Sequence, residues 1–406
     1  MRLSFKYRLY PSKEQTEFLR GELREACSLY NAALEERIGA WKVCRKSLNY
    51  YDQANQLKAM RADGCLTLAN FSCCQDILRR VDKTFKAFFA RVKRGAKPGF
   101  PRFKASCRYD SITFPSYGDG CKLTGNLLRI QGAGEIKVKL HRPVEGRIKT
   151  VSVKREAGRW FAVFSVECEV QTLPPSSHTT GIDLGLTSFA ILADGTEIEN
   201  PRHYRDAEAR LRRAQRKVAR RKKGSHRRRK AVRELQCAHA HVLNQRRDFL
   251  HKQSRDLINK HGMIAVEDLN VKGLARTNFA KSVHDAGWSM FIAMLAYKAE
   301  NAGRQLLRVN PHGTSQTCLC GANVAKTLRD RWHDCPACGL SASRDHVSAQ
   351  LILSRARNGL LGLNVEDAVS CVPQEAVALQ ATVVHSDVAV PLQHPMADVS
   401  GNRHDG

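Results

Sequence analysis

The chain has 406 residues, with 67 Lys and Arg against 39 Asp and Glu, so its formal net charge at pH 7 is +28. This length predicts two or three domains and a sizeable core, and so large a positive charge predicts a polyanionic partner bound with strong salt dependence. No apolar stretch is long enough to span a bilayer and no signal-peptide core follows Met1-Arg2, so we expect a soluble cytoplasmic protein rather than a membrane-embedded or exported one.

The charge is unevenly distributed along the chain. After Asn358 there is one Arg (Arg403) against six acids, a net charge of −5, so the preceding part carries +33. The tail 358–406 is rich in Val, Ala, Gln and Pro without a clear period, and we predict that it is disordered.

The first hundred residues predict one strand and then helices. Residues 1–10 alternate weakly between apolar and polar, which is typical of a strand. Ser12 and Gln15 have the spacing of a capping box, and an apolar stripe at helical spacing follows. With breaks near Gly64, helical patterning continues to about Lys93, so residues 11–94 are predicted to form a helical insertion.

The segment Arg91 to Lys104 (RVKRGAKPGFPRFK) breaks this helical pattern with Gly and Pro. It mixes basic residues with Phe100 and Phe103, which suits nucleic-acid contact by charge and stacking. A basic loop anchored by two buried Phe side chains is the alternative, and the sequence does not choose between them.

Short strands are predicted from Asp110 to Val170, with glycines that supply the turns between them. An antiparallel barrel or sandwich is the natural interpretation, and residues 1–10 could belong to it. We therefore predict one β-barrel domain made of residues 1–10 and 95–171, followed by a linker at 172–180.

A second domain is predicted from Gly181 onward. Asp183 lies in a short apolar run, and a second run, Ser188 to Leu192, leads into a hairpin signal at Asp194-Gly195. From Arg202 to Arg233 there are sixteen Lys and Arg against two acids. Such a run is often only a solvated face. Narrow stripes of apolar residues run through this one, so we favour helices that pack on the protein by one face and bind phosphates with the other.

Two further acids follow in the same domain. Glu267 ends the apolar run that starts at Met263, and Asp345 opens an apolar helical pattern. An apolar helix over Trp288 to Ala299 and a strand over Gln305 to Val309 lie between them. Alone, each acid has an ordinary interpretation as a turn residue or helix N-cap. Together, carboxylates at two strand ends and one helix start predict a site for two Mg²⁺ ions ~4 Å apart, which would hydrolyse a phosphodiester.

Four of the fourteen cysteines form two close pairs between the last two acids. Cys318 and Cys320 form the first pair, Cys335 and Cys338 form the second, and a Gly follows each pair. This pattern is typical of a structural Zn²⁺ site with no open coordination position. His312 and His333 are nearby substitutes, and iron–sulfur ligation is chemically possible. The other cysteines are scattered, as expected of reduced thiols.

Several motifs, in their order along the chain, resemble one known family. The sequences GIDLG, VEDLNVKG, TSQTC and CPACGLSASRDH resemble the RuvC motifs and embedded zinc finger of TnpB, the RNA-guided endonucleases of bacterial and archaeal insertion sequences and relatives of type V CRISPR effectors. FKYRLYPSKEQ and KPGFPRFK also resemble that family. The resemblance covers about Phe5 to Arg357. The first pair is Cys-x-Cys, where Cys-x-x-Cys is commoner in the family.

The resemblance implies a fold and a function. It implies a multidomain α+β fold: an RNase H-like (RuvC) nuclease lobe at 181–357 with a zinc-ribbon-like insertion at 314–342, and a wedge-like β-barrel with a helical recognition-like insertion. It also implies catalysis by Asp183, Glu267 and Asp345, a guide RNA from the transposon end, and a double-stranded DNA target beside a short motif. In a prokaryotic cytoplasm such a protein would associate with the nucleoid.

Other functions remain open from sequence alone. A transposase that joins DNA ends usually orders its acids Asp, Asp, Glu, which differs from the order here. A Holliday-junction resolvase would leave the segments before Gly181 without a role. An RNA-guided binder that does not cut would be favoured by the loss of one acid, but all three are present. A DNA-binding zinc-finger protein without catalytic activity would account for the positive net charge, but not for the order of the three acids.

Overall fold

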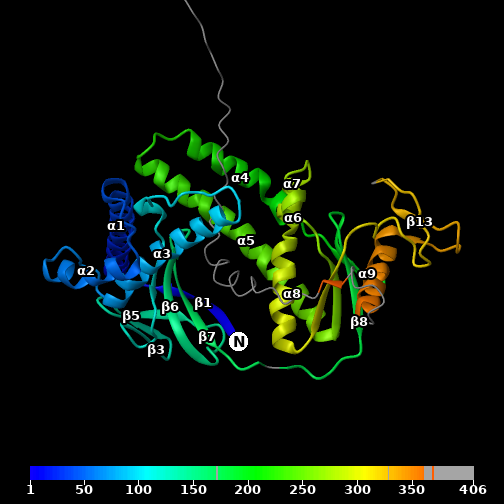
Figure 1. Ribbon diagram of the computed structural model, residues 1–406, viewed down its shortest axis with the longest axis horizontal. Helices are drawn as coiled ribbons and strands as arrows, with labels where there is room; N and C mark the ends of the chain where they lie inside the picture. Colours follow the sequence, from blue (N-terminus) through cyan, green and yellow to red (C-terminus); the bar gives the residue numbers. More distant parts are fainter. Residues whose placement is uncertain (171, 328, 361–367, 370–406) are drawn as a thin grey trace, which may run out of the picture.

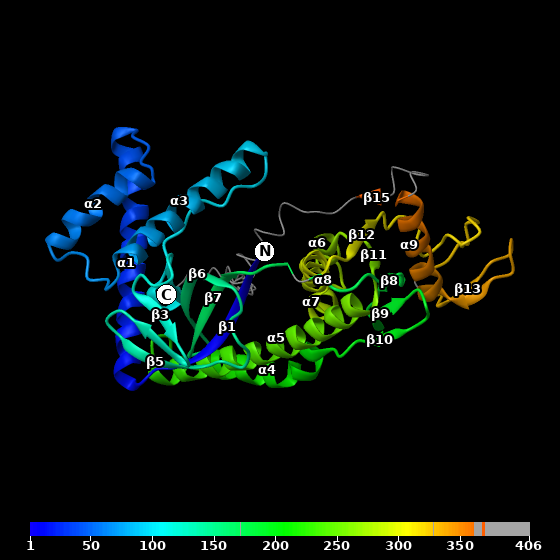
Figure 2. The same ribbon diagram turned by 90° about the horizontal axis from the view of Figure 1, so that it is seen from below.

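The computed structural model describes residues 1–170, 172–327, 329–360 and 368–369. The chain forms two lobes (Figures 1 and 2), one that ends with β7 (Arg159–Glu167) and one that begins with β8 (Thr179–Leu184). The long helix α5 (His226–Lys260) extends from the second lobe along the first. The fold is therefore α+β and multidomain, as predicted.

The first lobe contains a curled antiparallel sheet in the order β2-β6-β7-β1-β5-β4-β3. Its strands are β1 (Arg2–Tyr10), β2 (Ser111–Phe114), β3 (Cys121–Thr124), β4 (Leu127–Ile130), β5 (Gly134–Lys139), β6 (Arg147–Glu156) and β7 (Arg159–Glu167). The first strand lies at the centre, between β5 and β7, and buries alternate side chains. The strand predicted at residues 1–10 is thus confirmed as part of this sheet. Because β2 and β3 are edge strands that do not pair with each other, the sheet is curled rather than closed as the predicted barrel.

Three helices are inserted between β1 and β2: α1 (Lys13–Cys44), α2 (Tyr50–Ala62) and α3 (Phe71–Lys93), and a short 3₁₀ turn (Ser106–Arg108) precedes β2. The predicted capping box is confirmed, because the Ser12 hydroxyl accepts from the Gln15 amide while the Gln15 side chain accepts from the Ser12 amide. The helices and the sheet share one hydrophobic core.

The second lobe contains a mixed sheet in the order β10-β9-β8-β11-β12-β15. Its strands are β8 (Thr179–Leu184), β9 (Ser188–Leu192), β10 (Glu197–Glu199), β11 (Met263–Glu267), β12 (Gln305–Val309) and β15 (Ala368–Val369). The three strands β8, β11 and β12 are parallel, while β9, β10 and β15 run antiparallel to their neighbours.

The helices of this lobe cover both faces of the sheet. They are α4 (His203–Ala219), α5 (His226–Lys260), α6 (Val271–Leu274), α7 (Ala280–Ala286), α8 (Trp288–Ala302) and α9 (Arg344–Leu360), and a small hairpin of β13 (Trp332–Asp334) and β14 (Ser341–Ser343) precedes α9. Ile264 and Val266 of β11 pack with α5 and α8 on one face, whereas Ala265 packs with α9 on the other. Burial on both faces explains why this strand is a continuous apolar run. None of the described helices is long and apolar enough to cross a membrane.

Two predicted boundaries differ from the observed elements. The sheet begins at Thr179, inside the predicted linker 172–180. At the other end, α9 continues to Leu360 and β15 pairs with β12, in a tail for which no structure was predicted. Residues 361–367 and 370–406 lie outside the described residues.

The close packing of α9 on β8 depends on Gly181. A Cβ atom at this position would lie 2.1 Å from the backbone oxygen of Ala349, a contact that a backbone atom cannot relieve by rotating. We therefore expect Gly181→Ala to destabilise the second lobe by roughly 1–3 kcal/mol, the usual cost of overpacking.

The measurement is denaturant unfolding of the variant beside Gly39→Ala as the matched control. Gly39 lies within α1, and apart from its own chain neighbours and the backbone of the helix, a Cβ atom added there would have no heavy atom within 4 Å. We expect the control to be neutral or stabilising by up to about 1 kcal/mol. Equal unfolding midpoints for the two variants would contradict the packing account.

Candidate active site and cysteine cluster

Asp183 lies near the carboxyl end of β8, beside the end of β11. The two strands are parallel, and Val266 pairs with Ile182, so Asp183 and Glu267 are the next residues along the neighbouring strands. The Asp183 carboxyl is largely removed from water, and Glu267 and Asp345 add negative charge near it. Together these effects raise its pKa well above the ordinary value, and the Arg344 cation opposes them.

Glu267 is the last residue of β11 and is 7% exposed. Its carboxylate oxygen Oε1 accepts a 2.6 Å hydrogen bond from the hydroxyl of Thr314. Burial raises the pKa of Glu267, while this hydrogen bond and the charge of Arg355 act in the opposite direction. The hydroxyl of Thr314 thus orients the Glu267 carboxylate.

Asp345 lies in the first turn of α9, which runs antiparallel to β8. Arg357, near the end of the helix, donates to Thr179 at the start of the strand, and Ala349 lies against Gly181. This direction brings Asp345 to the carboxyl end of β8. Its oxygen Oδ1 is held by Arg344, with Nη2 at 2.8 Å and Nε at 2.9 Å, and Arg331 Nη1 lies 3.8 Å from Oδ2.

The fold therefore brings the three predicted carboxylates to one end of the second sheet, from β8, β11 and α9. Burial is the main cause of the raised pKa of Asp183, and the negative charges of Glu267 and Asp345 raise it further, which is the electrostatic consequence of this convergence. Hard oxygen ligands with like charge are the donor set that suits a divalent cation such as Mg²⁺, whose charge would relieve the repulsion.

Because these carboxyl pKa values are raised, we expect the folding stability of the Mg²⁺-free protein to depend on pH. Because the folded pKa values of Asp183 and Glu267 lie above those of the unfolded chain, the folded state binds more protons. The contribution of these two carboxyls to folding stability is fully present below the ordinary carboxyl pKa. It is lost as pH rises toward the raised values. Asp183→Asn stays neutral, so its stability should fall less than that of wild type as pH rises.

Thermal unfolding in buffer without added Mg²⁺, between about pH 4 and about pH 8, measures this difference. Asp194→Asn is the matched control, because the pKa of this exposed hairpin carboxyl is lowered rather than raised. Parallel curves for wild type and Asp183→Asn would show that Asp183 is ionised and solvated in the folded protein.

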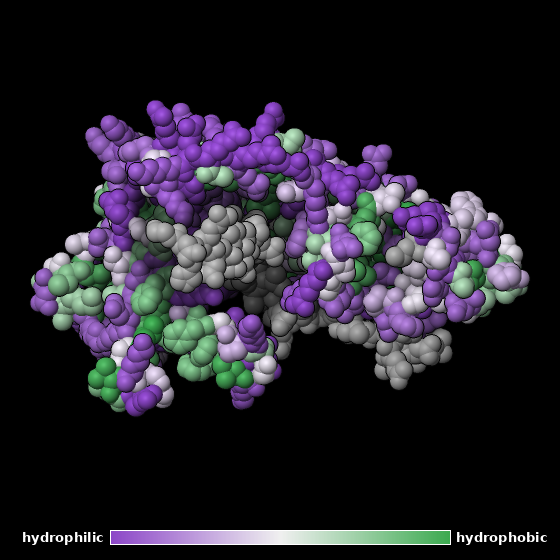
Figure 3. All heavy atoms as spheres, turned by 90° about the horizontal axis from the view of Figure 1, so that it is seen from above, coloured by the Kyte–Doolittle hydropathy of each residue, from purple (hydrophilic) through white to green (hydrophobic). Residues whose placement is uncertain are grey.

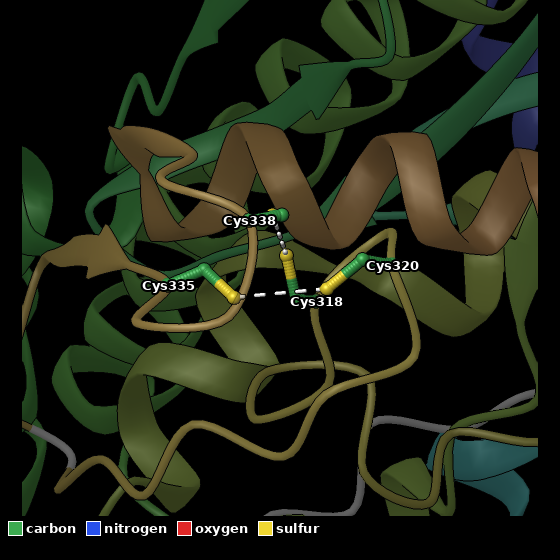
Figure 4. Close-up of side chains that lie close together, drawn as sticks. All are labelled: Cys318, Cys320, Cys335 and Cys338. Carbon is green, nitrogen blue, oxygen red and sulfur yellow. Dashed lines mark hydrogen bonds between the residues drawn. The ribbon is translucent and has the colours of Figure 1, made fainter.

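The four predicted cysteines meet in one cluster (Figure 4), and their sulfur atoms all lie within 4.8 Å of one another. The sulfur of Cys318 lies 3.6 Å from that of Cys338, and the sulfur of Cys320 lies 3.7 Å from that of Cys335. Each pair sits on a turn that is closed by a glycine with positive φ, Gly321 at 88° and Gly339 at 73°.

This cluster fits a tetrahedral metal. Four sulfurs at the Zn–S distance of about 2.3 Å from one ion are about 3.8 Å apart, close to the separations found here. Neither His312 nor His333 belongs to the group of possible ligands, so the short Cys-x-Cys pair reaches the site without a substitute. Backbone amides of Cys338 and Ala337 lower the pKa of Cys335 to about 7, which favours the thiolate that a metal binds, whereas hydrogen bonds with the other three sulfurs raise the pKa of Cys338 to about 12.

The basic segment forms two antiparallel helices, α4 and α5, as the stripes of apolar residues suggested. Leu211 of α4 packs with Ala238 and Val242 of α5 in a small separate core. At the end of α4 five cations line a hollow of about 420 Å³: Arg213, Arg216, Lys217, Arg220 and Arg221. The hydrophilic side chains over these helices occupy the upper edge of the molecule in Figure 3.

Several buried polar contacts of the second lobe, one of them in the site, were not predicted from sequence. Asp285 is buried and accepts from the backbone amide of Tyr204 at 2.8 Å, which satisfies the start of α4, and Arg246 pairs with it at 3.1 Å. Thr314 lies in the motif TSQTC, but its contact with Glu267 is made across 47 residues of sequence. Only the fold brings these partners together.

Comparison with known proteins gives matches along most of the chain. Family descriptions match residues 163–278 ("Probable transposase"), 288–352 ("Cas12f1-like, TNB domain") and 1–46 ("Helix-turn-helix domain"). A protein of Streptomyces pristinaespiralis described as "Putative RNA-guided DNA endonuclease" is 32% identical, with 88% of this chain and 91% of the relative covered. InsQ of Escherichia coli K12, with the same description, is 30% identical, with 86% and 91% covered.

More distant relatives agree with these matches. The CRISPR-associated endodeoxyribonuclease Cas12f1 of Sulfoacidibacillus thermotolerans is 25% identical, with 68% of this chain and 75% of the relative covered. A Cas12f1 chain solved in complex with guide RNA and target DNA has a similar fold, with a TM-score of 0.56 at 14% identity over 84% of this chain and 83% of that one. With its motifs in family order and two relatives of at least 30% identity covered almost end to end, the chain belongs to the TnpB family of RNA-guided DNA endonucleases encoded by insertion sequences.

Proposed function

We propose that this chain is an RNA-guided endonuclease that cuts double-stranded DNA by metal-dependent hydrolysis of phosphodiesters. The observation that carries the mechanism is the convergence of Asp183, Glu267 and Asp345 at one end of the second sheet. The lobe from β8 to α9 would then be an RNase H-like (RuvC) nuclease domain.

The three carboxylates would hold two Mg²⁺ ions, which supply an activated water and stabilise the leaving oxygen. Thr314 fixes one oxygen of Glu267 and leaves the other available to a ligand. Asp183, whose pKa is raised, would release its proton as cations enter. Arg344 holds Oδ1 of Asp345 and fixes the direction of this carboxylate.

The four cysteines would hold one structural Zn²⁺, with no position left for substrate. The finger at 314–342 is joined to α9 through Arg344, whose backbone amide donates to Arg331 and whose Nη1 donates to the Asp330 carbonyl at 2.8 Å. The same arginine holds Asp345, so an ordered finger would also keep the third carboxylate in place.

A guide RNA from the transposon end and a DNA target beside a short motif would be the partners. A hollow of about 850 Å³ between α2 and α3 supports placing contacts to the motif in the first lobe. It is lined by aromatic and polar side chains that include Tyr51, Phe71, Gln75 and Arg79. The first sheet would act as the wedge-like domain and α1–α3 as the recognition-like helices.

The basic end of α4 would bind phosphates of the nucleic acid. We expect Arg216→Glu with Arg220→Glu to lower nucleic-acid affinity and to reduce the slope of log K against log salt by about 0.7–0.9 for each phosphate that is no longer bound. Lys252→Glu is the control, because Lys252 on α5 already pairs with Asp248. Titrations at several salt concentrations measure the slope, and equal slopes in all three proteins would exclude α4 as the phosphate site.

The function is tested by purifying the protein from cells that carry the DNA flanking its gene and sequencing the RNA bound to it. We expect one discrete RNA that ends in sequence from outside the element. Heterogeneous RNA, or none, would contradict guided targeting and favour an unguided nuclease or a transposase in the strict sense.

A further inference from the structure

An exposed group of aromatic rings lies at the C-terminal end of α3, outside the candidate active site. Phe85, Phe88, Phe89 and Phe100, here called the α3 platform, form ring contacts with centroids 5.2 to 6.3 Å apart. The first three lie on the helix and Phe100 lies on the following loop. In Figure 2 α3 projects away from the first sheet, and in Figure 3 apolar side chains gather at its free end, in the lower centre of the view.

The exposure of these rings argues against a purely structural role. Phe89 is 59% exposed and Phe100 is 51% exposed, and Phe103 farther along the loop is 57% exposed. The alternative of a basic loop anchored by buried Phe100 and Phe103 is therefore wrong. The loop is anchored instead by Pro101, which is buried, and by Lys104, whose backbone amide and carbonyl both bond to the side chain of Asn31.

The charge around the platform suits a polyanion. Residues 83 to 104 contain eight Lys and Arg and no Asp or Glu. Lys86 pairs with Asp82, and Lys104 lies over the rings of Tyr30 and Tyr109. In the described part of the chain the remaining six make no ion pair with a carboxylate: Lys83, Arg91, Lys93, Arg94, Lys97 and Arg102.

We propose that the α3 platform binds the unpaired DNA strand that is displaced when the target duplex opens, by stacking its bases on Phe89 and Phe100 while the surrounding cations contact its phosphates. Aromatic rings in a basic groove are a general means of holding single strands, because every base has a π-face. In a duplex those faces are stacked on neighbouring bases, so a duplex could contact the platform only through its phosphates. This inference rests on the proposed function, since pairing of a guide with one target strand leaves the other strand unpaired.

The proposal is tested first by binding of the full-length protein to labelled dT₂₀ and to a labelled 20-base-pair duplex. The variant is Phe89→Leu with Phe100→Leu, which keeps apolar packing against Phe85 and Phe88 and removes the two exposed rings. We expect roughly a tenfold or greater loss of affinity for the single strand, little change for the duplex and an unchanged salt slope. Val92→Ala, which trims an exposed apolar side chain on the same helix end, should change neither affinity.

An unchanged affinity for dT₂₀, or equal losses for single strand and duplex, would overturn the platform as a base-stacking surface. The source of the strand is tested in the guided complex, by permanganate reactivity of thymines in the displaced DNA. We expect the double Leu variant to increase reactivity at a limited set of these thymines. Unchanged DNA reactivity, with an altered nuclease footprint on the bound RNA, would assign the platform to RNA instead. Neither measurement requires cleavage. A failure of the proposed nuclease function would therefore be seen separately, as absence of cleavage by the wild-type protein.

Discussion

Replacing Asp183 with Ala should abolish DNA cleavage and leave nucleic-acid binding nearly intact. The negative charges of Glu267 and Asp345 both act on Asp183, and its loss removes one of the three carboxylates that converge at the sheet end. Metal ions stabilise the charge of a phosphodiester transition state by several kcal/mol, so we expect cleavage to fall about a thousandfold or more. The cations of the basic helices, which we propose to contact phosphates, are unchanged, so binding should remain within about twofold.

The measurement is cleavage of a guided plasmid target beside a titration of the same RNA–protein complex with target DNA. Asp268→Asn is the matched control, because Asp268 follows Glu267 directly, is exposed and pairs with Arg308 at 3.2 Å. This control should cleave like wild type. If Asp183→Ala weakens binding and cleavage to the same extent, the residue supports the fold rather than the chemistry.

Replacing Cys335 with Ser should release zinc and destabilise the second lobe. Four sulfurs 3.6 to 3.7 Å apart in pairs are arranged for a shared cation, and one hydroxyl in place of a thiolate leaves an incomplete ligand set. Structural zinc contributes about 10–16 kcal/mol of apparent binding free energy in small peptides, so we expect several kcal/mol of lost stability even in this larger lobe.

Elemental analysis of the purified protein and limited proteolysis measure this effect. Cys65→Ser is the matched control, because Cys65 is an exposed free thiol in the first lobe. We expect the control to retain zinc and to resist protease like wild type, while Cys335→Ser is cleaved within the finger at 314–342. Unchanged zinc content in Cys335→Ser would remove the metal assignment.

Local signals in the sequence predicted the elements that hold the site. Glu267 ends a strand that is buried on both faces, so its apolar run and its boundary are visible without a structure. Ser12 and Gln15 satisfy each other within one helical turn, and the spacing alone predicts their contact. The cysteine pairs are equally local, and each turn needs only a following glycine.

Contacts between distant segments could not be predicted in this way. The Asp285 carboxylate accepts a hydrogen bond from the Tyr204 amide at the start of α4, from 81 residues away in the sequence. Nothing near Tyr204 indicates that partner. The antiparallel strands of the first lobe were predicted, but whether their sheet closes depends on curvature and strand order, which alternation does not encode. Phe100 and Phe103 could equally have been buried anchors, and only the packed structure leaves them exposed.

The most direct test of the central claim is to change the RNA and follow the cut. The protein is assembled with its co-purifying RNA after the segment from outside the element is replaced by a sequence matching a chosen plasmid site, with randomised flanking bases. We predict that cleavage moves to the new site in molecules that carry one short flanking motif, and that Asp183→Ala prevents it. Cleavage that stays at the old position, or that occurs without regard to the RNA, would contradict an RNA-guided nuclease.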